Sequence, residues 1–84
     1  MNNNNLRGAI GYAMRTQRLI HRKTLQQVAD YLGISKNQVS YYETGKTPIT
    51  IETLNSYCEF IGIDMVDLLT DITTHEEYFT DEPR

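Results

Sequence analysis

Apolar residues recur at helical spacing in five stretches of this chain, separated by short polar breaks. The first stretch runs from Leu6 to about Ile20 and the second from Leu25 to Leu32. Gly33 follows the second stretch, where a helix end favours a left-handed residue. The first two helices are expected to turn one face inward, formed by Leu6, Ile10, Ala13, Met14 and Gln17, and by Leu25, Val28, Ala29 and Leu32. No segment alternates as a strand does, so the pattern predicts an all-α protein.

Three more helices complete the predicted domain. The third spans about residues 36–43, the fourth follows a cap at Thr50, and the fifth begins after Asp64. Their expected inward residues are Val39 and Tyr42, then Ile51, Leu54, Cys58 and Ile61, then Val66, Leu69 and Met65. Residues 1–5 are expected to be a disordered polar start, 6–70 the folded domain, and 71–84 an acidic tail that is flexible or loosely docked.

The second and third helices each begin with a capping pattern. Thr24 precedes Gln27 by three residues, and Ser35 precedes Gln38 by the same spacing. In such a pair the hydroxyl accepts from the third helical N–H, and the glutamine side chain returns a hydrogen bond to the cap. Two short capped helices joined by three or four residues form a helix-turn-helix. The second helix of that motif can enter the major groove of DNA.

The charge is divided between the two halves of the chain. Residues 1–49 hold seven basic and two acidic residues, whereas residues 50–84 hold one basic and nine acidic residues. The net charge of −3 therefore conceals a basic half that contains the helix-turn-helix. Nucleic acid responds to the local field of a basic face. The same division also arises when both halves merely have solvated charged faces.

Composition argues against several other classes of protein. No apolar run approaches the roughly 20 residues that span a membrane, and the polar start lacks a secretory apolar region. We therefore expect a cytoplasmic protein. Cys58 is the single cysteine, and its spacing from Leu54 and Ile61 predicts a core position. His21 and His75 lack companions at ligand spacing, so no metal, no cofactor and no catalytic residue is expected. The chain is not expected to be an enzyme.

The motif residues match a known family over about residues 6–70. The matched positions are Ile10-Gly11, Met14-Arg15, Arg18, Val28-Ala29, Leu32-Gly33, Ser35, Val39, Tyr42-Glu43, Gly45-Lys46 and Asp67-Leu68-Leu69. Together they resemble the phage Cro/repressor (XRE-type) helix-turn-helix family. The resemblance implies a compact five-helix bundle of the lambda-repressor-like type. It also implies a transcriptional regulator, by analogy a repressor, that binds a palindromic operator in double-stranded DNA as a homodimer.

The resemblance assigns roles to individual residues. Base reading falls to Lys36, Asn37 and Tyr41, and also to Gln38, whose capping role competes with a base contact. Phosphate contacts fall to Thr24, Ser40, Lys46 and Thr47. Arg22 and Lys23 replace a common Gly-Leu of the family and add positive charge to that set. Arg18 and Glu43 match a buried ion pair. Leu25 departs from the family, because many members have a phosphate-contacting glutamine there.

The fifth helix has more apolar residues than it is expected to bury in its own domain. A dimer interface is therefore expected at Ile63, Met65, Leu68 and Ile72. A protein-interaction module, such as an antitoxin or anti-repressor, remains an alternative function. In that case the acidic C-terminal half would bind a basic protein.

Overall fold

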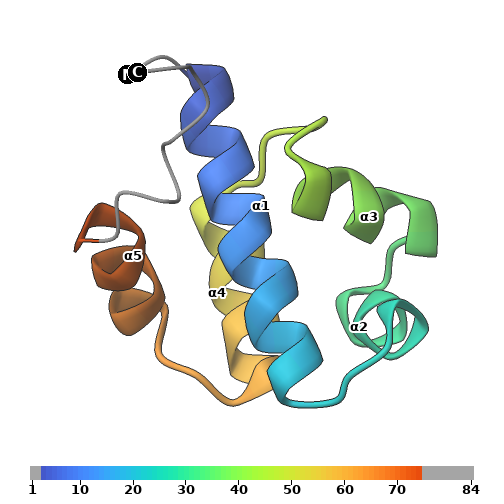
Figure 1. Ribbon diagram of the computed structural model, residues 1–84. Coiled ribbons are helices and arrows are strands. Elements are labelled where there is room, and N and C mark those ends of the chain that lie inside the picture. The colour runs from blue at the N-terminus through green and yellow to red at the C-terminus, as the bar shows by residue number, and fades with distance from the viewer. Residues whose placement is uncertain (1–2, 75–84) are drawn as a thin grey trace.

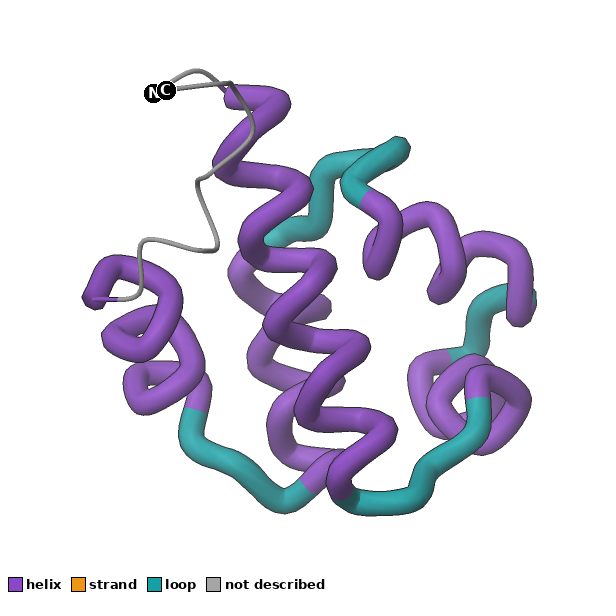
Figure 2. The backbone as a smooth tube through the Cα atoms, in the orientation of Figure 1, coloured by secondary structure: helices purple, strands orange, loops and turns teal. Residues whose placement is uncertain are grey.

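The computed structural model describes residues 3–74, which form five α-helices (Figures 1 and 2). They are α1 (Asn3–Ile20), α2 (Leu25–Leu32), α3 (Lys36–Thr44), α4 (Ile51–Ile61) and α5 (Met65–Thr74). The long α1 packs against α3, α4 and α5, while α2 packs against α3 and α4. In Figure 1, α2 and α3 lie on one side of α1 and α5 lies on the other. The all-α prediction is therefore confirmed.

The outer helix boundaries differ from those expected. The backbone is helical from Asn3, so residues 3–5 belong to α1 rather than to a disordered start. Similarly, α5 continues past residue 70 to Thr74 and takes in the first part of the expected acidic tail. The rest of that tail, residues 75–84, lies outside the described residues. No helix within residues 3–74 has the length and apolar character needed to cross a membrane.

The core gathers buried side chains from all five helices. Its members are Ala9, Ala13, Met14, Val28, Ala29, Val39, Leu54, Tyr57, Cys58, Ile61, Leu68 and Ile72. Cys58 lies in the core as predicted. Three expected members are wrong, because Leu6 is 40% exposed, Ile51 is 60% exposed and Val66 is 64% exposed. Ile51 is the first residue of α4. Val66 lies two residues, about 200° of helical rotation, from Leu68, which forms the buried face of α5.

The close contact between α1 and α3 depends on Gly11. A Cβ atom at this position would overlap the backbone carbonyl oxygens of Tyr42 and Glu43. Glycine therefore lets the C-terminal turn of α3 lie directly against the α1 backbone. This contact fixes the orientation of α3 relative to the rest of the domain.

Candidate nucleic-acid interface

The outward face of α3 presents a row of polar side chains. Lys36, Asn37 and Tyr41 are exposed, and Ser40 is half-buried between them. Val39 and Glu43 on the neighbouring face of the helix are buried. The spacing of i, i+1, i+4 and i+5 places the first set on one helical face. The three residues expected to contact bases by resemblance thus lie together on the exposed side of the motif's second helix.

The cap at the start of α3 is simpler than the sequence suggests. The Ser35 hydroxyl accepts from the Gln38 backbone N–H at 3.0 Å. The returning hydrogen bond expected from the Gln38 side chain is not among those formed within residues 3–74. The Ser35–Gln38 capping box is therefore only half formed. Its glutamine amide is left available for another partner, which removes the competition between capping and base contact.

Lys46 and Thr47 lie just beyond the C-terminal end of α3. Gly45 ends the helix with a φ of 78°, and the Lys46 and Thr47 amides both donate to the Tyr41 carbonyl, at 2.9 and 3.3 Å. The Lys46 ammonium lies 4.6 Å from the centre of the Tyr41 ring. This cation–π contact holds the charge of Lys46 against the outward face of α3.

The start of α2 supplies the other flank of the candidate interface. Here the capping box is complete. The Thr24 hydroxyl accepts from the Gln27 N–H at 3.0 Å, and the Gln27 side chain accepts from the Thr24 N–H at 2.8 Å. The Thr24 hydroxyl keeps its own proton for a further acceptor such as a phosphate oxygen. Arg22, two residues earlier, is exposed and has a φ of 59°, a conformation that favours glycine.

The Lys23 side chain is turned toward α4 in this structure. Its ammonium lies 5.0 Å from the centre of the Phe60 ring, and Phe60 in turn stacks on Tyr31 at 4.8 Å. The phosphate contact expected of Lys23 stays a prediction.

A buried hydrogen-bond network holds the two motif helices in place. Arg18 donates to both carboxylate oxygens of Glu43, through Nε at 2.8 Å and Nη2 at 3.0 Å. The third donor, Arg18 Nη1, reaches the Lys23 carbonyl at 2.8 Å, immediately before the cap of α2. The Glu43 hydrogen bond raises the pKa of Arg18 above its ordinary value. Arg18 and Glu43 thus form the buried pair that the resemblance implies.

Tyr57 joins this network and was missed by the sequence analysis. Its hydroxyl lies 2.6 Å from Glu43 Oε2 and 2.9 Å from the Met14 carbonyl oxygen, and the ring is fully buried. Burial, followed by the hydrogen bond to Glu43, raises the pKa of the phenol. A signal was available in the sequence, because Tyr57 lies three residues after Leu54 and four before Ile61 on the buried face of α4.

The expected dimer residues divide into two groups. Ile63 and Met65 are half-buried and pack on the outside of the core. Leu68 and Ile72 are only 4% and 1% exposed, so they belong to the core of their own domain. The prediction that Leu68 and Ile72 form an interface surface is therefore wrong. The domain accommodates them because α5 packs against α1 as well as α4.

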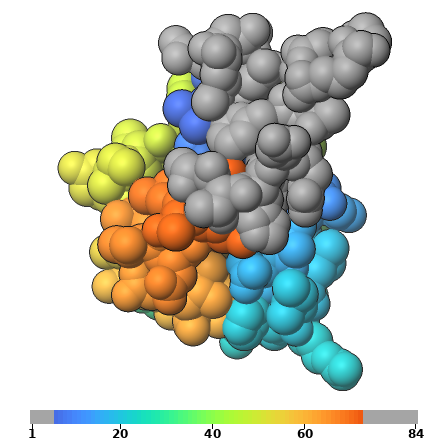
Figure 3. All heavy atoms as spheres, turned by 60° about the vertical axis from the view of Figure 1, so that its left-hand side comes forward, coloured from blue at the N-terminus to red at the C-terminus, as the bar shows by residue number. Residues whose placement is uncertain are grey.

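An acidic groove lies on the side of α1 away from the motif. Its volume is about 450 Å³, and it runs between α1 and α5. Gln17, Asp64, Asp67 and Asp71 are among its lining residues. The space-filling view of this side shows α5 and the C-terminal half of α1 as neighbouring surfaces (Figure 3). The three carboxylates of this groove are thus placed apart from Lys36 and Lys46.

Comparison with known proteins gives several related matches. Residues 14–68 match the helix-turn-helix family HTH_3. A crystal structure of the clp gene regulator ClgR from Corynebacterium glutamicum superposes with a TM-score of 0.77 and 30% identity, covering 82% of this chain and 90% of that one. A second ClgR structure gives a TM-score of 0.78 at 30% identity, covering 82% of this chain and 73% of that one.

A curated relative is antitoxin PezA from Streptococcus pneumoniae serotype 4. It is 30% identical over 60 residues, which are 71% of this chain. The match spans only 38% of the length of that protein.

Proposed function

The chain belongs to the helix-turn-helix family HTH_3, and from this premise we propose that it is a sequence-specific DNA-binding transcription regulator. The observation that supports the proposal best is the geometry of α3. Its outward face exposes Lys36, Asn37 and Tyr41, while its inward face is fixed to α1 through Gly11 and to Arg18 through Glu43. A rigidly held helix with an exposed polar face suits the major groove.

The exposed residues have chemistry that distinguishes base pairs. Lys36 can donate to guanine O6 or N7, and Asn37 can form two hydrogen bonds with adenine. The free Gln38 amide has the same capacity as Asn37. Tyr41, held beneath Lys46, offers its ring edge to a thymine methyl group or its hydroxyl to a phosphate.

The residues that we propose to contact phosphates flank this face on both sides. Thr24 and Arg22 lie at the start of α2, and Lys46 and Thr47 lie beyond the end of α3, with Ser40 between the two flanks. A hydroxyl with a free proton, exposed cations and a helix N-terminus all favour phosphate oxygens. The acidic groove on the far side of α1 would face away from the duplex, as electrostatic repulsion requires.

We further propose that the regulator acts as a homodimer on a palindromic operator and represses by occupying it. One such domain contacts few base pairs, and two domains set half-sites about 34 Å apart. The surface best suited to pairing is Ile63, Met65 and the exposed Val66, without Leu68 and Ile72. Val66→Asp should give a folded protein with a weakened dimer in sedimentation, whereas Leu68→Asp should unfold the domain. A dimer unaffected by Val66→Asp would exclude this surface.

The experiment that tests DNA binding is selection of bound duplexes from random sequence, followed by a salt titration. Each phosphate contact should contribute about 0.9 to the slope of log affinity against log salt concentration. Lys46→Ala should weaken binding to all duplexes equally and reduce that slope by about 1. Glu59→Ala, an exposed change on α4, serves as the control. Failure to enrich any sequence would contradict the proposal.

The similarity to antitoxin PezA favours one alternative, namely a module that binds a basic protein partner. The acidic groove between α1 and α5 would then be the contact surface. Asp67→Lys would abolish capture of that partner and leave DNA binding intact. A chain that co-purifies with a basic protein and enriches no duplex would favour this function over the first.

A further inference from the structure

The N-terminal part of α1 lies directly against the loop that follows α3. A Cβ atom on Gly45 would come within 3.0 Å of the Gly8 Cα atom and 3.2 Å of the Arg7 carbonyl carbon. Glycine at this position thus lets the α1 backbone approach the C-terminal end of α3 closely. The residue after Gly45 is Lys46, which we propose to contact phosphate. The start of α1 therefore lies at the edge of the candidate nucleic-acid interface.

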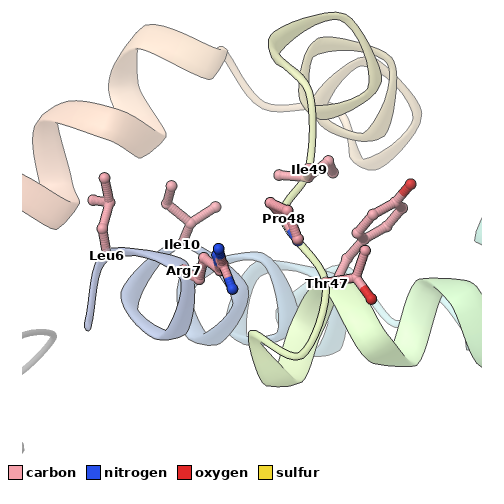
Figure 4. A pocket seen from close by; sticks show the side chains of 7 residues that line it. Leu6, Arg7, Ile10, Thr47, Pro48 and Ile49 are labelled. Carbon is pink, nitrogen blue, oxygen red and sulfur yellow. The ribbon is translucent and has the colours of Figure 1, made fainter. Parts of the chain in front are cut away.

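The Arg7 side chain belongs to the face of α1 that is turned toward α3. Arg7 precedes Gly11 by four residues, so the two positions share one helical face, and Gly11 is where that face meets the α3 backbone. Arg7 is half-buried and lines a groove of about 250 Å³ together with Thr47 and Pro48. Figure 4 shows Arg7 on α1, with Thr47 and Pro48 on the loop that faces it. A cation of α1 is thus brought beside the proposed phosphate contacts of the loop.

The charge of Arg7 is not compensated within the described domain. Its guanidinium forms no ion pair with any side chain of residues 6–72. Residues 1–49 contain only two acidic residues, Asp30 and Glu43. Glu43 is paired with Arg18, and Asp30 accepts from the Gln26 side chain on α2 at 2.8 Å. An uncompensated cation at this edge of the interface attracts an anion from outside the chain.

We propose that Arg7 contacts a backbone phosphate of the bound duplex, next to the phosphate contacted by Lys46 and Thr47. The inference rests on the proposed function and extends the interface from the helix-turn-helix to the start of α1. A guanidinium can donate two parallel hydrogen bonds to a phosphate, and such a contact has no base preference of its own. Arg7 therefore raises the affinity for every duplex and leaves sequence discrimination unchanged.

A salt titration with the full chain tests the contribution of Arg7. Arg7→Gln should weaken binding to the selected duplex and to unrelated duplexes by the same factor, several-fold, and should lower the slope of log affinity against log salt concentration by about 0.9. Arg7→Lys keeps the charge and should keep most of the slope. Asn55→Asp is the matched control, because it lowers the net charge by the same amount at an exposed position on α4 and should leave the slope near that of wild type. The urea midpoints of all these variants should match wild type, since both positions lie outside the core.

A second measurement locates the contact on the duplex. Each phosphate of the selected duplex is replaced in turn by an uncharged methylphosphonate, and binding is measured for wild type and for Arg7→Gln. At the phosphate that Arg7 contacts, the replacement should weaken binding of wild type and leave that of Arg7→Gln unchanged, because the interaction is already lost. The corresponding phosphate for Lys46→Ala should be its neighbour.

Two results would overturn the inference and leave the proposed function standing. The first is an Arg7→Gln protein with the wild-type slope and the wild-type response to every methylphosphonate. The second is an equal loss of slope in Asn55→Asp, because net charge alone would then explain the effect. Failure of wild type to bind any duplex would instead refute the proposed function, and the inference with it.

Discussion

Removing the Glu43 carboxylate should be among the most damaging single changes to this domain. Glu43 is 5% exposed and its partner Arg18 is 6% exposed. Without the carboxylate, Arg18 keeps only its hydrogen bond to the Lys23 carbonyl, and its charge is left buried and unpaired. Tyr57 loses less, because its hydroxyl can turn its proton to the Met14 carbonyl at 2.9 Å.

The expected loss in the free energy of unfolding follows from the hydrogen bonds that are removed and the charge that is left unpaired. Stranding one partner of a buried ion pair costs about 3–5 kcal/mol. Total stability for a domain is typically about 5–15 kcal/mol. With a denaturant slope near 1 kcal/mol per molar urea, the Glu43→Ala midpoint should fall by about 3–5 M. Tyr57→Phe should cost less, about 1.5–3 kcal/mol, because it removes one hydrogen bond to a charged group.

Urea unfolding followed by far-ultraviolet circular dichroism measures these differences. Glu59→Ala is the matched control, since Glu59 is an exposed glutamate inside α4. Replacing the pair together, Arg18→Met with Glu43→Leu, should recover most of the loss because no charge is then stranded. Equal midpoints for Glu43→Ala and Glu59→Ala would refute the reasoning. A double variant as unstable as Glu43→Ala would show that packing, not charge, is responsible.

Three further predictions concern backbone and thiol positions. Arg22→Gly should stabilise the domain by up to about 1 kcal/mol, because glycine adopts a φ of 59° at little cost. The same variant should bind DNA more weakly because it lacks the cation. A lower melting temperature for Arg22→Gly would contradict this prediction. Gly11→Ala should lower the melting temperature, because its Cβ would overlap two backbone carbonyl oxygens of α3. Gly8→Ala is the control and should leave the melting temperature unchanged, because its Cβ would meet open space. Equal melting temperatures for the two variants would disprove the close contact. Burial raises the pKa of Cys58 from 9.0 to about 11, so the folded thiol should resist alkylation at pH 8 until urea unfolds the chain. Because the thiol of the unfolded chain has the lower pKa, the free energy of unfolding should fall as the pH rises from about 9 to about 11. Rapid alkylation of the folded protein at pH 8 would show that the thiol is exposed.

The sequence predicts the helices well because their ends are set locally. Thr24, Ser35 and Thr50 each cap a helix, and each accepts the expected N–H hydrogen bond. Spacing alone does not tell which of two apolar faces of a helix is buried. Val66 and Leu68 lie on opposite sides of α5, and only packing against α1 decides which of them enters the core.

The candidate site shows the same division between local and tertiary information. The exposed face of α3 follows from helical periodicity around Val39. The position of Lys23 over Phe60 and the hydrogen bond from Tyr57 to Glu43 join residues 37 and 14 positions apart in sequence. No local pattern specifies such contacts. Whether the Gln38 side chain accepts the expected hydrogen bond from the Ser35 N–H likewise depends on its side-chain conformation.

The central claim is that side chains of α3 contact and distinguish bases. A double-mutant cycle, which combines a substitution at Asn37 with base-pair substitutions in the selected duplex, tests it most directly. Equilibrium binding is measured for wild type and Asn37→Ala against the selected duplex and against duplexes with each base pair replaced in turn. Asn55→Ala, an exposed asparagine on α4, is the control. We predict that Asn37→Ala loses about 1–3 kcal/mol and becomes indifferent to one base pair, while Asn55→Ala behaves as wild type. An Asn37→Ala protein that discriminates at every position as wild type does would contradict the claim.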